Sequence, residues 1–359
     1  MSSLKEQIGQ MLMVGISGEK LTQAEQSIIR QFPFGGFILF GRNCCEPAQI
    51  VSLCHSLWAT GKAYPPFIAI DQEGGRVHRV PKPFTHFPAA SRVGQRGDLN
   101  LAYRAGRATA GELASAGINL NFAPVLDVHS NPQNLIIGDR SFGTDPTNVS
   151  KFGGQWMQGL RDGGIIPCGK HFPGHGDTDK DSHLDLPVVE KSLEKLKGTE
   201  LPPFIHVCHK QIESLMTSHV IYRALDSKLP ATLSRPIITG LLRKDLGYEG
   251  VVFGDDMDMK AISDNYGPDE AVSLSVWAGA DMLLYGHDLT KAVHAFEFLR
   301  SEADKDPAIR VRVENNYRRI EKLKRRRLKT FTGVGGKELV ARLARLGHQR
   351  LVDAIHGNL

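Results

Sequence analysis

The chain has 359 residues, of which 41% are hydrophobic and 23% are charged, and its formal net charge is +5. These proportions are typical of a folded protein with an ample apolar core, and the modest charge gives no reason to expect a nucleic-acid partner. No stretch approaches the roughly 18 uninterrupted apolar residues that a membrane span requires. The length exceeds that of one ordinary domain, yet single barrels of alternating strands and helices reach it routinely.

The N-terminal stretch MSSLKEQIGQMLMVG has no basic segment followed by a long apolar one. We therefore expect neither secretion nor insertion into a membrane. The five cysteines are odd in number, and Cys44 and Cys45 are adjacent, which is a poor layout for a disulfide framework. Reduced thiols in a cytoplasm fit this pattern best, and no CxxC pair indicates zinc or redox chemistry.

Eight short apolar, β-branched or aromatic runs recur along the chain with helix-like segments between them. They span residues 11–15, 36–40, 66–71, 118–128, 165–171, 215–220, 251–255 and 280–285. Strands that alternate with helices pair in parallel through right-handed crossovers. Eight such units predict an α/β fold, a (β/α)8 barrel of the TIM type, in one domain over residues 1–359. Residues 288–359 are expected to form the last barrel helix and further C-terminal helices outside the barrel.

One predicted helix has an identifiable start. Thr22 and Glu25 form a capping-box pattern, and Ala24, Ile28 and Phe32 follow at fourfold spacing. This pattern predicts a helix between the first two strands.

The run KLKRRRLK at residues 322–329 is locally very basic and follows Glu321 in a helix-like segment. A solvated helical face explains such a run better than an anionic partner or a membrane surface.

Polar residues gather after five of the predicted strands. In a barrel of this type the loops that follow the strands form the catalytic face. The clusters are DQEGGRVHR at 71–79, Asp127 and His129 with GDRSF at 138–142, KHFPGHGDTDKDSHLDLP at 170–187, TSH at 217–219, and GDD at 254–256. Solubility does not explain this repetition, so we expect an active site at this face.

The stretch at residues 170–187 allows three interpretations on chemistry alone. His171, His175, Asp177 and His183 have the side chains that bind zinc or iron. Alternatively, Asp181 and His183 form an acid/base pair in which the carboxylate orients the imidazole. In the third interpretation, the stretch is a hydrogen-bonded loop whose histidines have no special role.

Nine motifs in one order resemble the β-N-acetylglucosaminidases of glycoside hydrolase family 3, the NagZ-type enzymes of bacterial cell-wall recycling. The resemblance runs from residue 11 to residue 284. The motifs are MLMVG, IDQEGGRVHR, NFAPVLDV, IGDRSFG, KHFPGHGDT followed by DSH, LMTSH, PATLS, GVVFGDDMDM and AGADMLL. The KH…DSH element resembles the N-acetylglucosaminidase branch of the family rather than its β-glucosidase branch.

The resemblance implies a role for each matching residue. Asp255 falls at the position of the nucleophile, His183 at that of the general acid/base, and Asp181 at that of its partner. The positions where the family binds its sugar correspond to Asp71, Arg79, Arg140, Lys170 and His171. One departure is Gly254, where the family usually has Ser or Thr, so a hydroxyl beside the nucleophile is missing.

The function implied is the retaining hydrolysis of terminal β-linked N-acetylglucosamine through a covalent glycosyl-Asp255 intermediate. The implied substrate is a muropeptide-derived sugar, N-acetylglucosamine on 1,6-anhydro-N-acetylmuramic acid with or without its peptide. We expect a cytoplasmic monomer with no cofactor, no metal, and no nucleic-acid or membrane partner. The alternatives are a family 3 β-glucosidase, an N-acetylglucosamine phosphorylase, a metal-dependent barrel hydrolase and a non-catalytic sugar-binding relic.

Overall fold

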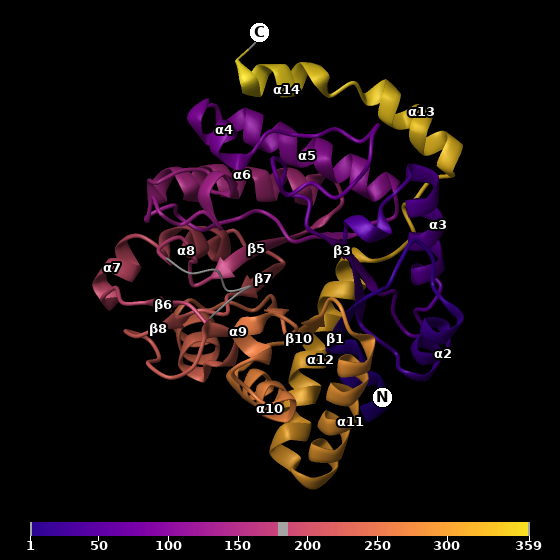
Figure 1. Cartoon of the computed structure of the whole chain (residues 1–359), viewed down its shortest axis with the longest axis vertical. Coiled ribbons are helices and arrows are strands. Elements are labelled where there is room, and N and C mark those ends of the chain that lie inside the picture. Colours follow the sequence, from indigo (N-terminus) through magenta and orange to yellow (C-terminus); the bar gives the residue numbers. More distant parts are fainter. Residues whose placement is uncertain (1, 179–185, 358–359) are drawn as a thin grey trace.

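Eight parallel strands close into a barrel in the computed structural model of the protein, which describes residues 2–178 and 186–357 (Figure 1). Around the barrel the strand order is β1-β10-β9-β7-β5-β4-β3-β2. The strands are β1 (Leu12–Gly15), β2 (Gly36–Leu39), β3 (Phe67–Ile70), β4 (Leu120–Asn121), β5 (Ile166–Phe172), β7 (Ser214–Thr217), β9 (Val251–Asp256) and β10 (Met282–Tyr285). The predicted TIM-type (β/α)8 fold is confirmed.

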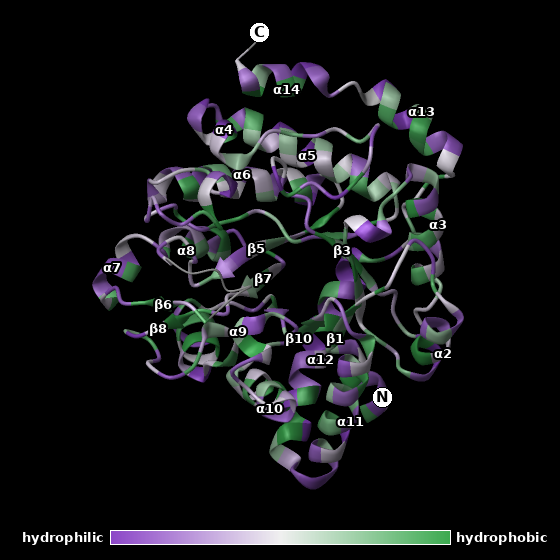
Figure 2. Ribbon diagram, in the orientation of Figure 1, coloured by the Kyte–Doolittle hydropathy of each residue, from purple (hydrophilic) through white to green (hydrophobic). Residues whose placement is uncertain are grey.

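The barrel strands are buried along almost their whole length, because side chains fill the interior and helices cover the outside. Phe253 of β9 meets Phe67 and Phe122 edge to face inside the barrel, with ring centroids 6.1 and 5.4 Å away. Figure 2 shows hydrophobic residues on the central strands and mixed colouring on the surrounding helices.

The fourth strand is shorter than predicted. The sequence indicated residues 118–128, but β4 ends at Asn121. Pro124 has no N–H to donate to a strand ladder, so the regular pairing stops before it. The chain still runs beside β5, because the Leu126 N–H donates to the Lys170 carbonyl at 2.7 Å. This irregular path brings Asp127 to the carboxyl end of the barrel.

Helices surround the barrel and alternate with its strands. Those before β10 are α1 (Leu4–Gln10), α2 (Gln23–Gln31), α3 (Pro47–Trp58), α4 (Ala90–Gln95), α5 (Leu99–Ser115), α6 (Pro146–Asp162), α7 (Leu193–Gly198), α8 (Pro202–His209), the π-type helix η4 (Pro236–Asp245), α9 (Lys260–Ser263) and α10 (Pro268–Ala278). Three short 3-10 turns are η1 (Gly41–Asn43), η2 (Gly138–Arg140) and η3 (Ala231–Leu233).

Helix α2 begins with the predicted capping box, in which Thr22 and Glu25 bond to each other's backbone N–H groups. Ala24, the first residue of the fourfold spacing, is exposed, and Glu25 is buried. Glu25 also accepts the Ser17 N–H at 2.7 Å. This bond turns the Glu25 face of the helix toward the barrel.

Four helices follow β10: α11 (Leu289–Lys305), α12 (Pro307–Arg327), α13 (Gly336–Leu346) and α14 (Gln349–His356). In Figure 1, α13 and α14 lie along α3 and α5 on one flank of the barrel. His348, before α14, contacts Glu112 of α5 through a 2.8 Å bond between Nδ1 and Oε1.

The basic run at the end of α12 is only partly the solvated face that the sequence predicted. Lys324 is fully buried, and its Nζ donates to Gln10 Oε1 at 2.7 Å and to the Gly35 carbonyl at 2.6 Å. Arg327 donates to the carbonyls of Arg161 and Ile165. These side chains close the amino end of the barrel, where backbone carbonyls and a side-chain amide offer acceptors.

Two further strands, β6 (Val188–Val189) and β8 (Ile221–Tyr222), form a small parallel sheet that the sequence analysis did not predict. Tyr222 joins this sheet to the loop after β5, because its hydroxyl donates to the Gly174 carbonyl at 2.8 Å. Within residues 2–178 and 186–357, no helix has the length and apolar character needed to cross a membrane.

Candidate active site

A cavity of about 700 Å³ opens at the carboxyl ends of the barrel strands. Side chains from loops after seven strands line it. They include Phe40 after β2, Asp71, Glu73 and Arg79 after β3, Arg140 after β4, Lys170, His171 and His175 from β5 and its loop, Met216 of β7, Asp255 and Asp256 of β9, and His287 after β10. The cavity therefore brings together Asp255 and all five residues predicted to bind sugar.

Lys170 and Arg140 are held by a shared carboxylate. Lys170 Nζ lies 2.5 Å from Asp71 Oδ1 and 2.6 Å from Glu73 Oε1. Arg140 donates to both Glu73 oxygens, at 2.8 and 2.9 Å, in the paired geometry that guanidinium and carboxylate favour. All four side chains are therefore fixed before any substrate arrives.

The charge states of this cluster follow from these contacts. Burial alone would lower the pKa of Lys170, but Asp71 and Glu73 outweigh it and raise that pKa. Burial would raise the pKa of Glu73, but Arg140 and Lys170 hold it far below its usual range. The cluster is thus charged near neutral pH and presents fixed donors and acceptors to a polar ligand.

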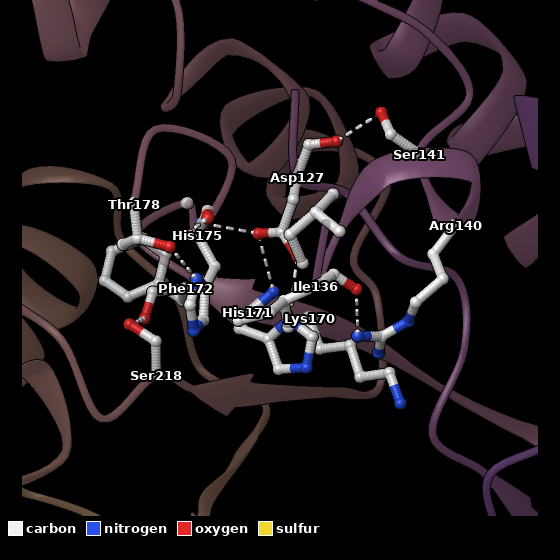
Figure 3. Close-up of polar contacts among 12 residues, drawn as sticks. Asp127, Ile136, Arg140, Ser141, Lys170, His171, Phe172, His175, Thr178 and Ser218 are labelled. Carbon is white, nitrogen blue, oxygen red and sulfur yellow. Dashed lines mark hydrogen bonds and ion pairs between the residues drawn. The ribbon is translucent and has the colours of Figure 1, made fainter. Parts of the chain in front are cut away.

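Asp127 orients the loop after β5 (Figure 3). It is fully buried, and its Oδ2 lies 2.7 Å from His171 Nδ1. Its Oδ1 accepts the N–H groups of His171 and His175, at 3.0 and 2.7 Å. Although burial would raise the pKa of Asp127, these contacts lower it. The His171 ring is therefore held by an ionised carboxylate.

His175 is buried, and its Nδ1 lies 2.9 Å from the Thr178 hydroxyl. Burial and the neighbouring His171 lower the pKa of His175 to about 4, so its ring is neutral near pH 7.

Arg79 lies in the cavity wall without an acidic partner among residues 2–178 and 186–357. Its backbone N–H donates to Gln72 Oε1 at 2.8 Å, which fixes the main chain. The side-chain Nε is buried and has no hydrogen-bond partner in the described part of the chain. A buried donor of this kind is costly unless a ligand satisfies it.

Asp255 is partly exposed at the end of β9 and lines the cavity. Its Oδ1 accepts the N–H of Asp256 at 2.8 Å, so the backbone of the strand helps to orient the carboxylate.

Asp256 has different partners, as the alternation of side chains along a strand predicts. Its carboxylate accepts the N–H groups of Gly286 and Asp258, at 3.1 and 3.0 Å. Burial raises the pKa of Asp256 to about 7. These bonds connect the end of β9 to the loop after β10.

Asp181 and His183 lie outside the described residues. The residues on either side are anchored: Lys191 Nζ lies 3.0 Å from Asp177 Oδ1 and 2.6 Å from Glu200 Oε1.

Of the four residues in the metal-binding interpretation, His171, His175 and Asp177 have the partners given above, and His183 is not described. The described residues contain no group of three or more His, Cys, Asp or Glu side chains placed to hold a metal ion.

Two residues that had no predicted role also belong to this site. Glu73 and Asp127 lie within quoted motifs, and both are buried carboxylates that hold predicted sugar-binding residues. His219 of the TSH cluster at 217–219 is fully buried and does not line the cavity, and its Nε2 lies 2.9 Å from the Asp256 carbonyl. The available signal was that Glu73 closely follows β3 and that Asp127 lies at the end of the predicted fourth run. The partners of both residues are far apart in sequence and could not be predicted.

Comparisons with known proteins find chains that are similar in sequence and in fold. A family model described as the glycosyl hydrolase family 3 N-terminal domain matches residues 3–323. A β-hexosaminidase from Alkalilimnicola ehrlichii is 38% identical over 329 residues, which cover 88% of this chain and 92% of that protein. The structure of a family 3 β-N-acetylglucosaminidase from Paenibacillus superposes with a TM-score of 0.87 at 37% identity, covering 96% of this chain and 68% of that one. NagZ from Neisseria gonorrhoeae, in complex with N-trifluoroacetyl-D-glucosamine, gives 0.80 at 31% identity and covers 97% of both chains.

Proposed function

The chain belongs to glycosyl hydrolase family 3, and on that basis we propose that it is a retaining exo-β-N-acetylglucosaminidase. The proposed nucleophile is Asp255, and the proposed acid/base is His183 with Asp181 as its partner. The observation that carries the proposal is the cavity that contains Asp255 together with Asp71, Arg79, Arg140, Lys170 and His171.

In the first proposed step, the Asp255 carboxylate attacks the anomeric carbon through an oxocarbenium-like transition state. The glycosidic bond breaks as protonated His183 donates its proton to the departing oxygen. The product is a glycosyl ester on Asp255.

In the second step, neutral His183 takes a proton from water, whose oxygen bonds to the anomeric carbon. The ester bond breaks, Asp255 leaves as a carboxylate, and the sugar is released with net retention. An imidazole suits both steps, because its ordinary pKa of about 6.5 lies near neutral pH.

The fixed charges around the cavity supply the contacts for sugar binding. Lys170, Arg140 and Arg79 offer charge-assisted donors to hydroxyl and carbonyl oxygens, and Asp71 offers an acceptor. Arg79 supports this role most directly, since a ligand oxygen would satisfy its buried Nε. His171, held by Asp127, offers its remaining ring nitrogen to the cavity.

The proposed substrate is N-acetylglucosamine β-linked to 1,6-anhydro-N-acetylmuramic acid, with or without its peptide, which places the enzyme in peptidoglycan recycling. We propose that it acts as a monomer in the cytoplasm. The NagZ relative, bound to an N-acylated glucosamine, supports the acetamido sugar.

The direct test is hydrolysis of p-nitrophenyl β-N-acetylglucosaminide beside the matching β-glucoside, with and without a chelator. We expect chelator-insensitive release from the acetamido sugar alone. Release from the β-glucoside at equal rate would contradict the proposed specificity, and N-acetylglucosamine 1-phosphate in phosphate buffer would indicate a phosphorylase. Sensitivity to the chelator would favour a metal-dependent hydrolase.

Two variants test the assigned roles. Asp255→Asn should abolish turnover, and near-normal activity would overturn the nucleophile assignment. His183→Ala should lose about 10²- to 10⁴-fold in kcat, the usual contribution of acid/base assistance. That loss should be smaller on aryl glycosides with good leaving groups, since their departure needs no proton.

A further inference from the structure

Thr232 of η3 lies beside the end of β9, where Asp255 is located. It is fully buried, and its hydroxyl lies 2.8 Å from the Thr217 hydroxyl and 2.9 Å from His219 Nδ1. It also lies 3.1 Å from the Ser218 carbonyl. The hydroxyl is therefore the centre of a small buried network between the loop after β7 and η3.

The His219 ring connects this hydrogen-bond network to β9. Its Nε2 lies 2.9 Å from the Asp256 carbonyl, and a carbonyl oxygen can only accept, so Nε2 carries a proton. Its Nδ1 lies 2.9 Å from the Thr232 hydroxyl, which donates to the Ser218 carbonyl. The N–H of Asp256 donates to Asp255 Oδ1 at 2.8 Å. Thr232 and His219 thus fix the residue whose backbone orients the proposed nucleophile.

Thr232 also contacts β9 on the other side of Asp255. A Cβ atom added to Gly254 would lie 3.1 Å from Thr232 Cγ2, closer than ordinary van der Waals contact. The next nearest atom, the Met282 carbonyl oxygen, would lie 3.7 Å away. A side chain at position 254 would therefore require the Thr232 methyl group to shift by a few tenths of an ångström.

We propose that Thr232 and His219 are positioning residues for Asp255, and that Gly254 is the partner that Thr232 requires. The hydroxyl and the imidazole hold the backbone after Asp255, while the methyl group packs against the backbone before it. This inference rests on the proposed function, in which Asp255 is the nucleophile.

The first test replaces the hydroxyl while keeping the shape of the side chain. Thr232→Val should lower kcat about three- to tenfold, the effect of one lost buried hydrogen bond, with KM changed less than twofold. Thr232→Ser keeps the hydroxyl and should retain kcat within about twofold. The matched control is Thr239→Val in η4, which also loses a bond, to the Ala278 carbonyl, but lies away from the cavity. It should alter Tm without altering kcat.

The second test uses the contact between Thr232 and Gly254. Gly254→Ser should lower kcat severalfold, because its Cβ would displace Thr232 and its bonds. The double variant Gly254→Ser with Thr232→Ser should recover most of that loss, since the clashing methyl group is gone and the hydroxyl remains. If Thr232→Val fails to fold, the comparison of Gly254→Ser with the double variant still tests whether Thr232 positions Asp255.

The inference is overturned if Thr232→Val has wild-type kcat, or if the double variant is no better than Gly254→Ser alone. A fall in kcat that accompanies an equal fall in the Thr239→Val control would also overturn it. If the wild type is active and one of these contrary results is found, the inference alone is refuted. If the wild type, as expected of Asp255→Asn, releases no N-acetylglucosamine, the proposed function and the inference are refuted together.

Discussion

Two lysines are buried at opposite ends of the barrel, and their surroundings differ. Lys170, 2% exposed at the carboxyl end, lies between the carboxylates of Asp71 and Glu73, which raise its pKa. Lys324, 0% exposed at the amino end, donates to neutral oxygens, and burial lowers its pKa well below the usual value. The Lys324 ammonium also lies 4.7 Å from the centre of the Phe67 ring.

This difference separates the carboxyl end of the barrel, which is arranged to bind a ligand, from the amino end, where buried side chains only close the barrel. Paired charges around an opening offer a polar ligand directed bonds without further rearrangement. A lysine held by a carbonyl and an amide fills space and satisfies acceptors, but presents no charge to a ligand. We therefore expect substitutions at the carboxyl end to affect turnover, and substitutions at the amino end to affect only the free energy of unfolding.

The largest effect is expected for Lys170→Met. It removes the cation that lies between two carboxylates, and breaking a buried ion pair lowers the free energy of unfolding by about 3–5 kcal/mol. We expect kcat/KM for the aryl N-acetylglucosaminide to fall at least about 100-fold, the usual cost of removing one charge-stabilising donor from an active site. Steady-state kinetics with the exposed Lys305→Met as control measures this. Turnover within twofold of wild type would remove Lys170 from the site.

A comparable loss of stability, with a definite pH dependence, is expected for Glu73→Gln. The pKa of Glu73 is lowered in the folded protein, so its stabilisation is present above about pH 4.5 and is lost as the pH falls. Denaturant unfolding should show Glu73→Gln to be less stable by about 3–5 kcal/mol at pH 7. The gap should narrow below pH 4.5, and a gap that does not depend on pH would contradict the ion-pair assignment.

Asp256→Asn should show the opposite pH dependence. The pKa of Asp256 is raised from 3.8 to about 7, so its contribution to stability is present below about pH 4 and is lost as the pH rises through 7. The free energy of unfolding of the wild type, relative to the variant, should fall by roughly 2–4 kcal/mol between pH 4 and pH 8. Parallel curves for the two proteins would show that Asp256 titrates normally.

The smallest effect is expected for Lys324→Met. Relief from burying an ammonium offsets the loss of its bonds to Gln10 and Gly35, so the free energy of unfolding should change by less than about 1 kcal/mol. Turnover should stay within twofold. A loss of turnover like that of Lys170→Met would break the proposed separation between the two ends.

Much of the barrel could be predicted from the sequence, because each strand is an apolar run and five of these runs are followed by clusters of polar residues. That order placed Asp71, Lys170 and Asp255 at the carboxyl end of the barrel, and the family resemblance supplied their expected roles. The predictions that were wrong concerned features that depend on contacts between residues far apart in the sequence. Neither the burial of Lys324 against Gly35 nor the short β4 strand before Pro124 is visible in local periodicity.

The same limit applies within the candidate site. Glu73 was visible as one acidic residue in a polar motif, but its position between Lys170 and Arg140 depends on how β3, β4 and β5 bring their loops together. The close contact between Gly254 and the Thr232 methyl group could likewise not be predicted from the sequence, since only the fold places η3 beside β9. Sequence motifs identified the residues, and the structure was needed to show which ones hold the others in place.

The closure of the barrel between β1 and β10 also affects how the protein is made. Leu12 of β1 pairs with Leu283 of β10. The first strand therefore lacks this partner until the ribosome has synthesised the last strand of the barrel. At about 5–20 residues per second, that interval lasts on the order of tens of seconds. Until then one edge of β1 is unpaired, and closing so long a loop is slow compared with local pairing. Chaperone dependence during synthesis should therefore be greatest in the interval before β10 emerges.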